Sequence, residues 1–319
     1  MDELLQIFDE PCPAPEPPCP FAPFPQSYLT GPVPAHLKDQ TVSYLAARLC
    51  RLPLEEAAAL VSFGAVWLDD RPCFKPDQPL DAHQSFRINP PAYGPVKFYE
   101  ANPSRIVYED DDLLIYNKES GRPSQGVPHD GYNNILSALG RLLQNRDGKK
   151  QGLWLLHRLD ADTSGLLMLA KNKDAASAMG RDFQRGRVAK EYLCVGLGAT
   201  PKGDFVMDAP VAKEGRHYAS RPGLLGLAAR TSFFPLGCRE AAVQANGLNA
   251  VLFRAVPHTG RTHQIRLHLA LAGWPIGGDR FYGLGPEQDT WPRLMLASSQ
   301  LKFNQPRTGQ EMTVNLTTD

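Results

Sequence analysis

The densest group of reactive side chains in the sequence lies between residues 157 and 167. Asp160 and Asp162 stand there beside a histidine and an arginine, and apolar runs border the segment at 153–156 and 166–170. A polar loop between two rigid strands is a common way of holding catalytic side chains. An Asp-x-Asp-Thr-Ser-Gly turn that only bonds its own backbone fits equally well. The segment by itself leaves a catalytic site and a simple turn as equal alternatives.

A second group of polar side chains lies in the sequence HTGRTHQIRLH at residues 258–268. Its histidines are five residues apart, whereas metal ligands on one helix face are four apart, so the spacing disfavours zinc. Arg266 follows Thr262 by one helical turn, near the start of a helix predicted to end at Gly273. At that position Arg266 could present its cation to a carboxylate or a phosphate.

A third short segment, Lys190 to Leu193, belongs to a strand predicted over residues 188–197. Alternation places Lys190 and Tyr192 on one face of that strand, and the opposite face is apolar. A tyrosine that is half-buried on a sheet explains the segment when it is taken alone. Its meaning depends on the two groups described above.

Together and in this order, the three segments closely resemble the RluA-type RNA pseudouridine synthases. The shared pattern is HRLDxxTSGL, then KEYL, then GRTHQIRLHL. The segments DDDLLIYNK at 110–118 and PIGGDRFYG at 275–283 match the same family. The resemblance covers roughly residues 104–316. It implies an enzyme with an α+β fold, built on a mixed, largely antiparallel sheet.

The resemblance implies that uridine in an RNA chain is isomerised to pseudouridine. A carbon–nitrogen glycosidic bond breaks, the base turns, and it rejoins the sugar through a carbon. No atom is added, so we expect neither a cofactor nor a metal. One carboxylate can attack the sugar or the base, much as in retaining glycosidases, while water is kept out. The resemblance assigns this role to Asp160 rather than to Asp162.

The resemblance also implies roles for residues around Asp160. Arg266 should pair with Asp160, because a nearby opposite charge favours the ionised carboxylate, and Tyr192 should stack on the target base. A uridine in structured RNA must first leave its stack. Arg158 could fill the vacated space, since a guanidinium stacks and binds phosphate; pairing with a local acid is the alternative. Further RNA contacts are predicted for His157, Lys118, Lys190, Arg261, His263 and Gln264.

The chain divides into four predicted parts. Ten of the 29 prolines fall in residues 1–34, which predicts an acidic, proline-rich arm without helix or strand. Residues 35–89 predict two short helices and a hairpin. This part resembles the small RNA-binding module, first named for a ribosomal protein, that often precedes such a catalytic domain. A linker at 90–104 and the catalytic domain at 105–319 follow.

Apolar runs predict the main elements of the catalytic domain. Asp174 and Thr262 stand where their side chains could cap the second and third helices. The predicted strands cover residues 113–116, 153–156, 166–170, 188–197 and 251–256, and the predicted helices cover 132–143, 174–184 and 262–273.

The charge balance is neutral, with 34 basic and 34 acidic residues. At first this argues against an RNA partner, because Lys and Arg supply most of the affinity for phosphates. The first 30 residues hold five acids and no base, however, and without them 34 bases face 29 acids. Four arginines fall within 251–280 with a single acid. We therefore predict a basic face around the site and a shallower salt dependence than that of a strongly basic RNA binder.

Other features narrow the class of protein. No apolar run approaches the roughly 20 residues of a membrane helix, and the start is acidic where a secretory signal is basic. Together these predict a cytoplasmic protein, expected to be a monomer. The six cysteines form no Cys-x-x-Cys pair, so they predict free thiols.

Two other functions fit parts of the sequence. A metal-dependent phosphoryl-transfer enzyme could use Asp160 and Asp162, but it would need further carboxylates nearby. A non-catalytic RNA-binding assembly factor would act through the small module and leave Asp160, Tyr192 and Arg266 idle. The favoured hypothesis is a pseudouridine synthase acting on ribosomal large-subunit RNA rather than tRNA.

Overall fold

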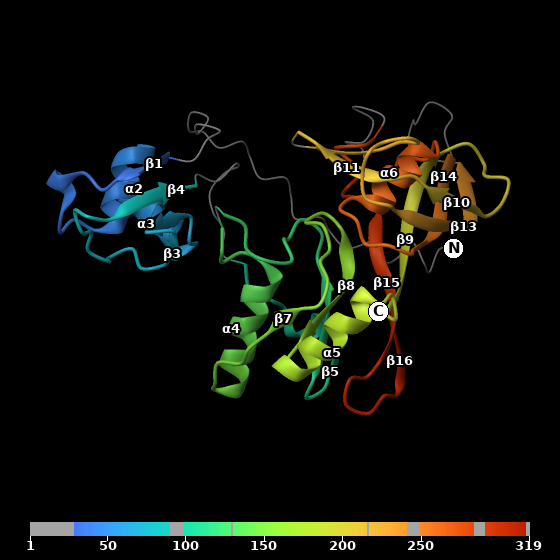
Figure 1. Cartoon of the computed structure of the whole chain (residues 1–319), viewed down its shortest axis with the longest axis horizontal. Coiled ribbons are helices and arrows are strands. Elements are labelled where there is room, and N and C mark those ends of the chain that lie inside the picture. Colours follow the sequence, from blue (N-terminus) through green and yellow to red (C-terminus); the bar gives the residue numbers. More distant parts are fainter. Residues whose placement is uncertain are drawn as a thin grey trace. The chain divides into compact units, whose positions relative to one another are not determined.

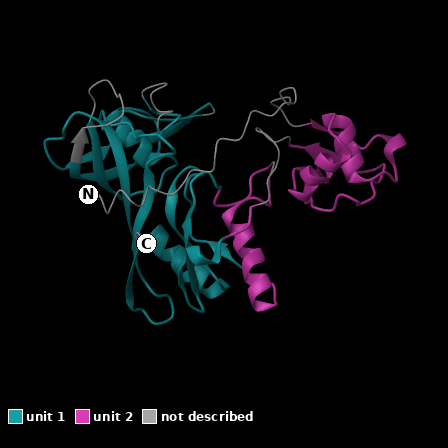
Figure 2. Cartoon of the chain, turned by 180° about the vertical axis from the view of Figure 1, so that it is seen from behind, with its two compact units in different colours: residues 1–13, 102–122, 152–319 teal, residues 14–101, 123–151 magenta. Residues whose placement is uncertain are grey.

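The computed structural model describes residues 29–89, 99–128, 130–215, 217–240, 249–283 and 291–316. These residues form two compact units (Figure 2). The larger unit contains the described residues of 102–122 and 152–316, and the smaller unit those of 29–101 and 123–151. Most of the predicted arm and of the predicted linker lies outside the described residues. The predicted boundary at residue 105 stays a prediction, since 123–151 groups with the smaller unit.

A four-stranded antiparallel sheet and two helices form the first part of the smaller unit (Figure 1). The predicted helices and hairpin are confirmed, and the apolar faces of α2 and α3 share one core with the sheet. The strands, in sheet order, are β1 (Leu29–Pro32), β4 (Ser85–Ile88), β2 (Val66–Leu68) and β3 (Arg71–Cys73), and the helices are η2 (Ala35–Leu37), α2 (Val42–Cys50) and α3 (Leu54–Ser62).

Strand β1 corrects the prediction for residues 1–34. Its four residues pair with β4, so the expectation that no strand forms in that range is wrong for 29–32. The strand lies at the edge of the sheet, where a proline such as Pro32 is tolerated because one side of the backbone needs no ladder bond.

Helix α4 (Ile135–Asp147) completes the smaller unit and confirms the predicted helix there. It begins three residues later than predicted, because Asn134 takes an extended conformation and its side chain accepts a hydrogen bond from the Ser137 amide. Gly148 ends the helix with φ 69°.

A ten-stranded sheet forms the larger unit, in the order β10-β13-β14-β9-β15-β8-β6-β5 with β16 on β15 and β7 on β8. Among the described strands only β15 and β8 pair in parallel, so the predicted mixed, largely antiparallel sheet is confirmed. Its strands are β5 (Ile106–Glu109), β6 (Leu113–Lys118), β7 (Trp154–Leu155), β8 (Ser164–Ala170), β9 (Ala189–Gly198), β10 (Phe205–Asp208), β13 (Arg230–Glu240), β14 (Asn249–Pro257), β15 (Leu296–Asn304) and β16 (Glu311–Asn315).

Shorter elements of the larger unit complete the fold. A separate hairpin consists of β11 (Val211–Glu214) and β12 (His217–Ser220), and a short 3-10 helix, η3 (Pro103–Arg105), precedes β5. The helices are α5 (Lys173–Gln184), which packs on β8, and α6 (Gln264–Leu271), which packs against β12 (Figure 1).

Both predicted helix caps of the larger unit are wrong. Asn172 caps α5, its side chain accepting from the Ala175 amide, and Asp174 lies in the first turn. Helix α6 is preceded by His263, which has φ 57° and provides no side-chain cap, so Thr262 is not the cap. The predicted end is confirmed: α6 stops before Gly273, whose φ of 93° is left-handed.

Strand β8 is buried on both faces along its whole length. Its side chains form one core with β6 and α5, including Leu113, Leu166, Met168 and Met179. The loop before β8 is therefore fixed to a rigid part of the sheet. None of the described helices is long and apolar enough to cross a membrane.

Candidate active site

Asp160 lies in the loop between β7 and β8. Its side chain is 27% exposed, and its carbonyl accepts a hydrogen bond of 3.1 Å from the Thr163 amide. Gly165, two residues beyond Thr163, has φ 99°, and a Cβ there would overlap the Ser298 carbonyl of β15. A glycine is thus required where β8 meets β15. The loop offers the Asp160 carboxylate to solvent from a fixed backbone.

Arg266 of α6 lies directly behind Asp160. Its side chain is 2% exposed, and its Nη1 is 3.6 Å from Asp160 Oδ2. Two further nitrogens, Nε and Nη2, each donate a 2.7 Å hydrogen bond to the buried carboxylate of Asp279. Burial alone would lower the pKa of Arg266, but Asp279 and Asp160 raise it. The structure thus brings together Asp160 and Arg266, with a permanent cation behind the carboxylate.

Asp279 is the main residue that sequence reasoning missed. Besides binding Arg266, its Oδ1 accepts from the backbone amides of Phe281 and Tyr282 at 3.0 and 3.1 Å. At the preceding Gly278, φ is 75° and a Cβ would overlap the Arg293 carbonyl. The signal was present in the sequence, since Asp279 is the single acid among the arginines of 251–280.

His263 adjoins the carboxylate on another side. Its Nε2 is 3.8 Å from Asp160 Oδ2, and its Nδ1 is 2.7 Å from the Tyr282 hydroxyl. Burial lowers the pKa of His263, against the attraction of Asp160, which raises it. The ring is therefore held in place between Asp160 and Tyr282, and its predicted contact with RNA stays a prediction.

Tyr192 lies on β9, opposite Ser298 of β15. Its side chain is buried, and burial together with the charge of Asp160 raises the pKa of the phenol well above its usual value. Tyr192 therefore keeps its proton at physiological pH. The same strand carries Lys190, whose pKa is lowered by burial.

Two predicted RNA contacts are wrong because the side chains are buried. Lys118 is inaccessible and donates to the carbonyls of Glu119, Arg122 and Ala161 at 2.7 to 2.8 Å. Burial lowers the pKa of Lys118 to about 7, against the attraction of nearby carboxylates. Gln264 is also buried. Both the oxygen and the nitrogen of its side-chain amide form hydrogen bonds with neighbouring protein groups. Both side chains support the loops of the site instead.

The remaining predicted contacts differ in their availability. His157 accepts from the Met168 amide through Nε2, stacks on Phe183 and has its pKa lowered by burial, and its predicted contact with RNA stays a prediction. Arg158 is exposed and pairs with no acid among the described residues. Arg261 is exposed and uses its Nε on the Ala228 carbonyl. The roles of Arg158, Lys190 and Arg261 in RNA binding stay predictions.

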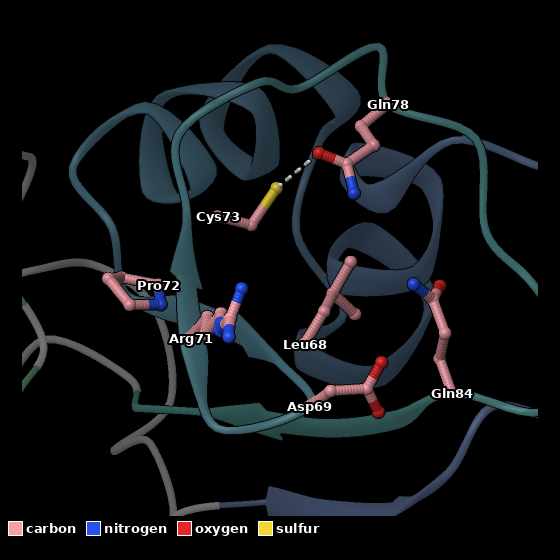
Figure 3. Close-up of a pocket in the computed structure, with 7 residues that line it drawn as sticks. All are labelled: Leu68, Asp69, Arg71, Pro72, Cys73, Gln78 and Gln84. Atoms are coloured by element: carbon pink, nitrogen blue, oxygen red, sulfur yellow. Dashed lines mark hydrogen bonds between the residues drawn. The ribbon is translucent and has the colours of Figure 1, made fainter.

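The smaller unit has a pocket of about 420 Å³ (Figure 3). Asp69 accepts from the Ser85 amide, and Cys73 Sγ lies 3.5 Å from Gln78 Oε1. Burial raises the pKa of Cys73, so its thiol is not a ready nucleophile. The pocket is lined by Leu68, Asp69, Arg71, Pro72, Cys73, Gln78 and Gln84. Within the described parts of the chain, no three His, Cys, Asp or Glu side chains gather to hold a metal.

Residues 112–271 match the family model of the RNA pseudouridylate synthases. This chain belongs to that family. The RluA-type resemblance is thereby confirmed, whereas the match does not extend to the small N-terminal module. Asp160, Tyr192 and Arg266 all lie within the matched segment.

Curated relatives agree with this assignment. Ribosomal large subunit pseudouridine synthase D of Nitrosomonas europaea is 36% identical over 66% of this chain and 61% of its own length. Dual-specificity RNA pseudouridine synthase RluA of Vibrio vulnificus is 33% identical over 64% of this chain and 79% of its own. The chain thus spans under two thirds of the first relative and more of the second.

Among solved structures, human RNA pseudouridylate synthase domain containing 1 is 26% identical with a TM-score of 0.55. The similarity covers 68% of this chain and 86% of the human protein. The human domain containing 4 has a TM-score of 0.53 at 23% identity and supports the fold.

Proposed function

We propose that this chain is an enzyme that isomerises specific uridines of structured RNA to pseudouridine. The observation that carries the proposal is the partly exposed Asp160 carboxylate, held 3.6 Å from the buried cation of Arg266. The names of the relatives favour ribosomal large-subunit RNA over tRNA as substrate. The cytoplasmic location and monomeric state expected from the sequence are part of the proposal.

In the proposed reaction Asp160 attacks the sugar or the base and releases the bond between C1′ and N1. The base turns, C5 bonds to C1′ and the bond to Asp160 breaks. C5 loses its proton and N1, which carries none in uridine, gains one, so atoms balance without a cofactor. Arg266 holds a cation beside the carboxylate before the reaction begins, which spares reorganisation during it. The protonated Tyr192 flanks the base on the buried side. A uridine must leave its stack to reach this site.

The test is a map of pseudouridines in ribosomal RNA and tRNA from cells that lack the protein. We expect one or more sites to disappear, to return with the wild-type chain, and to stay absent with Asp160→Asn. The same variant should still bind the RNA. Asp162→Asn is the matched control, since it removes the neighbouring carboxylate and should restore the sites. An unchanged map, or turnover by Asp160→Asn, overturns the proposal; sites that return with Asp160→Asn would favour an assembly factor.

A further inference from the structure

Five ring side chains, which we call the aromatic rim, lie together beside Asp160. His263 is at their centre, with its ring centroid 5.6 Å from that of Tyr218, 6.1 Å from that of Phe281 and 5.5 Å from that of Tyr282. His217 adjoins Phe281 at 6.2 Å. Hairpin β11–β12 supplies His217 and Tyr218, and the loop after Gly278 supplies Phe281 and Tyr282. Two segments distant in sequence therefore build one cluster next to the carboxylate.

Phe281 and His217 are the exposed members of the aromatic rim, and Phe281 is 56% exposed. Its inner side faces His263 at an interplanar angle of 22°, and the Arg266 guanidinium lies 5.4 Å from its centroid. Its backbone does not move freely, since the Phe281 amide donates to Asp279. Tyr282, by contrast, uses its hydroxyl on His263. A fixed backbone thus presents a large apolar ring to solvent at the entrance of the site.

We propose that Phe281, with His217, stacks an unpaired RNA base that flanks the target uridine. The inference rests on the proposed function and deepens it. When a uridine leaves its stack, a neighbouring base loses a stacking partner, and an exposed aromatic ring replaces it. Tyr192 is assigned to the target base and is buried on β9, so Phe281 serves a different nucleotide. The exposed Arg280 beside it suits the phosphate of that nucleotide.

The first test compares variants at position 281 on a short RNA that contains the uridine identified by mapping. Phe281→Ala should lower kcat/KM roughly tenfold, the smaller end of the range for losing one base–aromatic stack. Phe281→Leu should lower kcat/KM similarly, because leucine is apolar but has no ring. Phe281→Trp should keep kcat/KM near the wild-type value, because it retains an aromatic ring. Leu225→Ala is the control, since Leu225 is 95% exposed and outside the aromatic rim, and its kcat/KM should stay at the wild-type value.

The second test removes the base instead of the ring. RNAs that carry an abasic ribose on either side of the target uridine are assayed with the wild type and with Phe281→Ala. At one of the two flanking positions, we expect the abasic ribose to lower the kcat/KM of the wild type roughly tenfold. It should not lower the kcat/KM of Phe281→Ala any further, because both changes remove the same stack. If the losses in kcat/KM from the abasic ribose and from Phe281→Ala multiply, or if the Phe281 variants keep the wild-type kcat/KM, the stacking inference is wrong and the proposed function still stands. A wild-type chain that forms no pseudouridine overturns the proposed function and this inference with it.

Discussion

At the scale of single residues, the site depends on an ion pair that is hidden from solvent. Arg266 and Asp279 are 2% and 1% exposed and joined by two hydrogen bonds of 2.7 Å. Such a pair adds little net stability over apolar residues, but losing one partner leaves a buried charge uncompensated. The remaining Arg266 nitrogen faces Asp160. Asp279 therefore acts on the reaction through Arg266 and does not touch the substrate.

Replacing Asp279 by Asn tests this arrangement. We expect Asp279→Asn to lower the free energy of unfolding by about 3 kcal/mol, because Arg266 keeps its charge without a full counterion. It should also lower kcat more than it raises KM. Urea unfolding and steady-state kinetics measure both. Glu311→Gln is the control, since it breaks an exposed pair with Lys302 and should change neither. Wild-type stability in Asp279→Asn would contradict the account.

At the scale of elements, the end of β6 supports the loop that carries Asp160. The Lys118 ammonium donates to the Ala161 carbonyl and the Ser120 hydroxyl donates to the Asp162 carbonyl, both at 2.7 Å. These bonds hold the backbone directly after Asp160, and β8 begins two residues beyond Asp162. The loop is therefore fixed between two neighbouring strands of one sheet.

Lys118→Met should loosen this loop while filling a similar volume. The loss of three hydrogen bonds is expected to cost about 3 kcal/mol of unfolding free energy. We expect kcat to fall with little change in KM, because Lys118 is buried and acts by positioning Asp160. A variant with a wild-type kcat would show that the bonds are not needed to hold the carboxylate.

The same variant gives a pH dependence of known sign. The pKa of Lys118 is about 7 in the folded chain and 10.5 in its ordinary state. Below pH 7 both states hold the proton. From about pH 7 to pH 9 the unfolded chain alone holds it, so unfolding becomes less favourable as pH rises. The free energy of unfolding of the wild type minus that of Lys118→Met should grow by roughly 1 kcal/mol per pH unit. Urea titrations across this range that give a constant difference would contradict the prediction.

At the scale of the whole molecule, charge is distributed more evenly than the arginine count suggests. Several cations of the larger unit pair with acids, including Arg254 with Glu191, Arg266 with Asp279 and Arg307 with Asp112. These pairs leave fewer cations to displace counterions from RNA. We therefore still expect a moderate electrostatic contribution to RNA binding, with shape and base extrusion supplying the rest.

The salt dependence of binding measures this balance. We expect Asp160→Asn, which binds without turnover, to show a slope of log affinity against log salt that corresponds to fewer than about five phosphates. Titrating the mapped RNA at several potassium chloride concentrations provides the slope. A slope matching about ten neutralised phosphates would contradict the prediction.

Local sequence patterns predicted the helices and strands whose residues show a clear apolar spacing. Helices α2 and α3 follow from amphipathic spacing, and β8 follows from its apolar run. Strand β15 was missed because LASSQLKFN carries polar residues on both faces, and only its pairing with β9, β8 and β16 makes it a strand. The cap of α5 was missed because Asn172 and Asp174 are both good cap residues, and sequence does not say which turns extended.

The parts of the site that lie within sequence motifs were predictable. The resemblance predicted that Asp160 and Arg266 lie together, and they do. It did not predict that Lys118 and Gln264 are buried, because residue type suggests an exposed contact and only the packed loops show otherwise. The partnership of Arg266 with Asp279 was missed for a similar reason: an acid among arginines reveals a charge but not its partner.

Asp279 holds the loop through the amides of Phe281 and Tyr282 and not through the side chain at position 281. The backbone path therefore does not depend on which residue stands there. A substitution that keeps the amide at position 281 leaves the Asp279 bonds to Arg266 and to the loop in place. Under the proposed stacking role, exchanging the ring at position 281 changes which base is accepted beside the target uridine and leaves the Asp279–Arg266 pair in place.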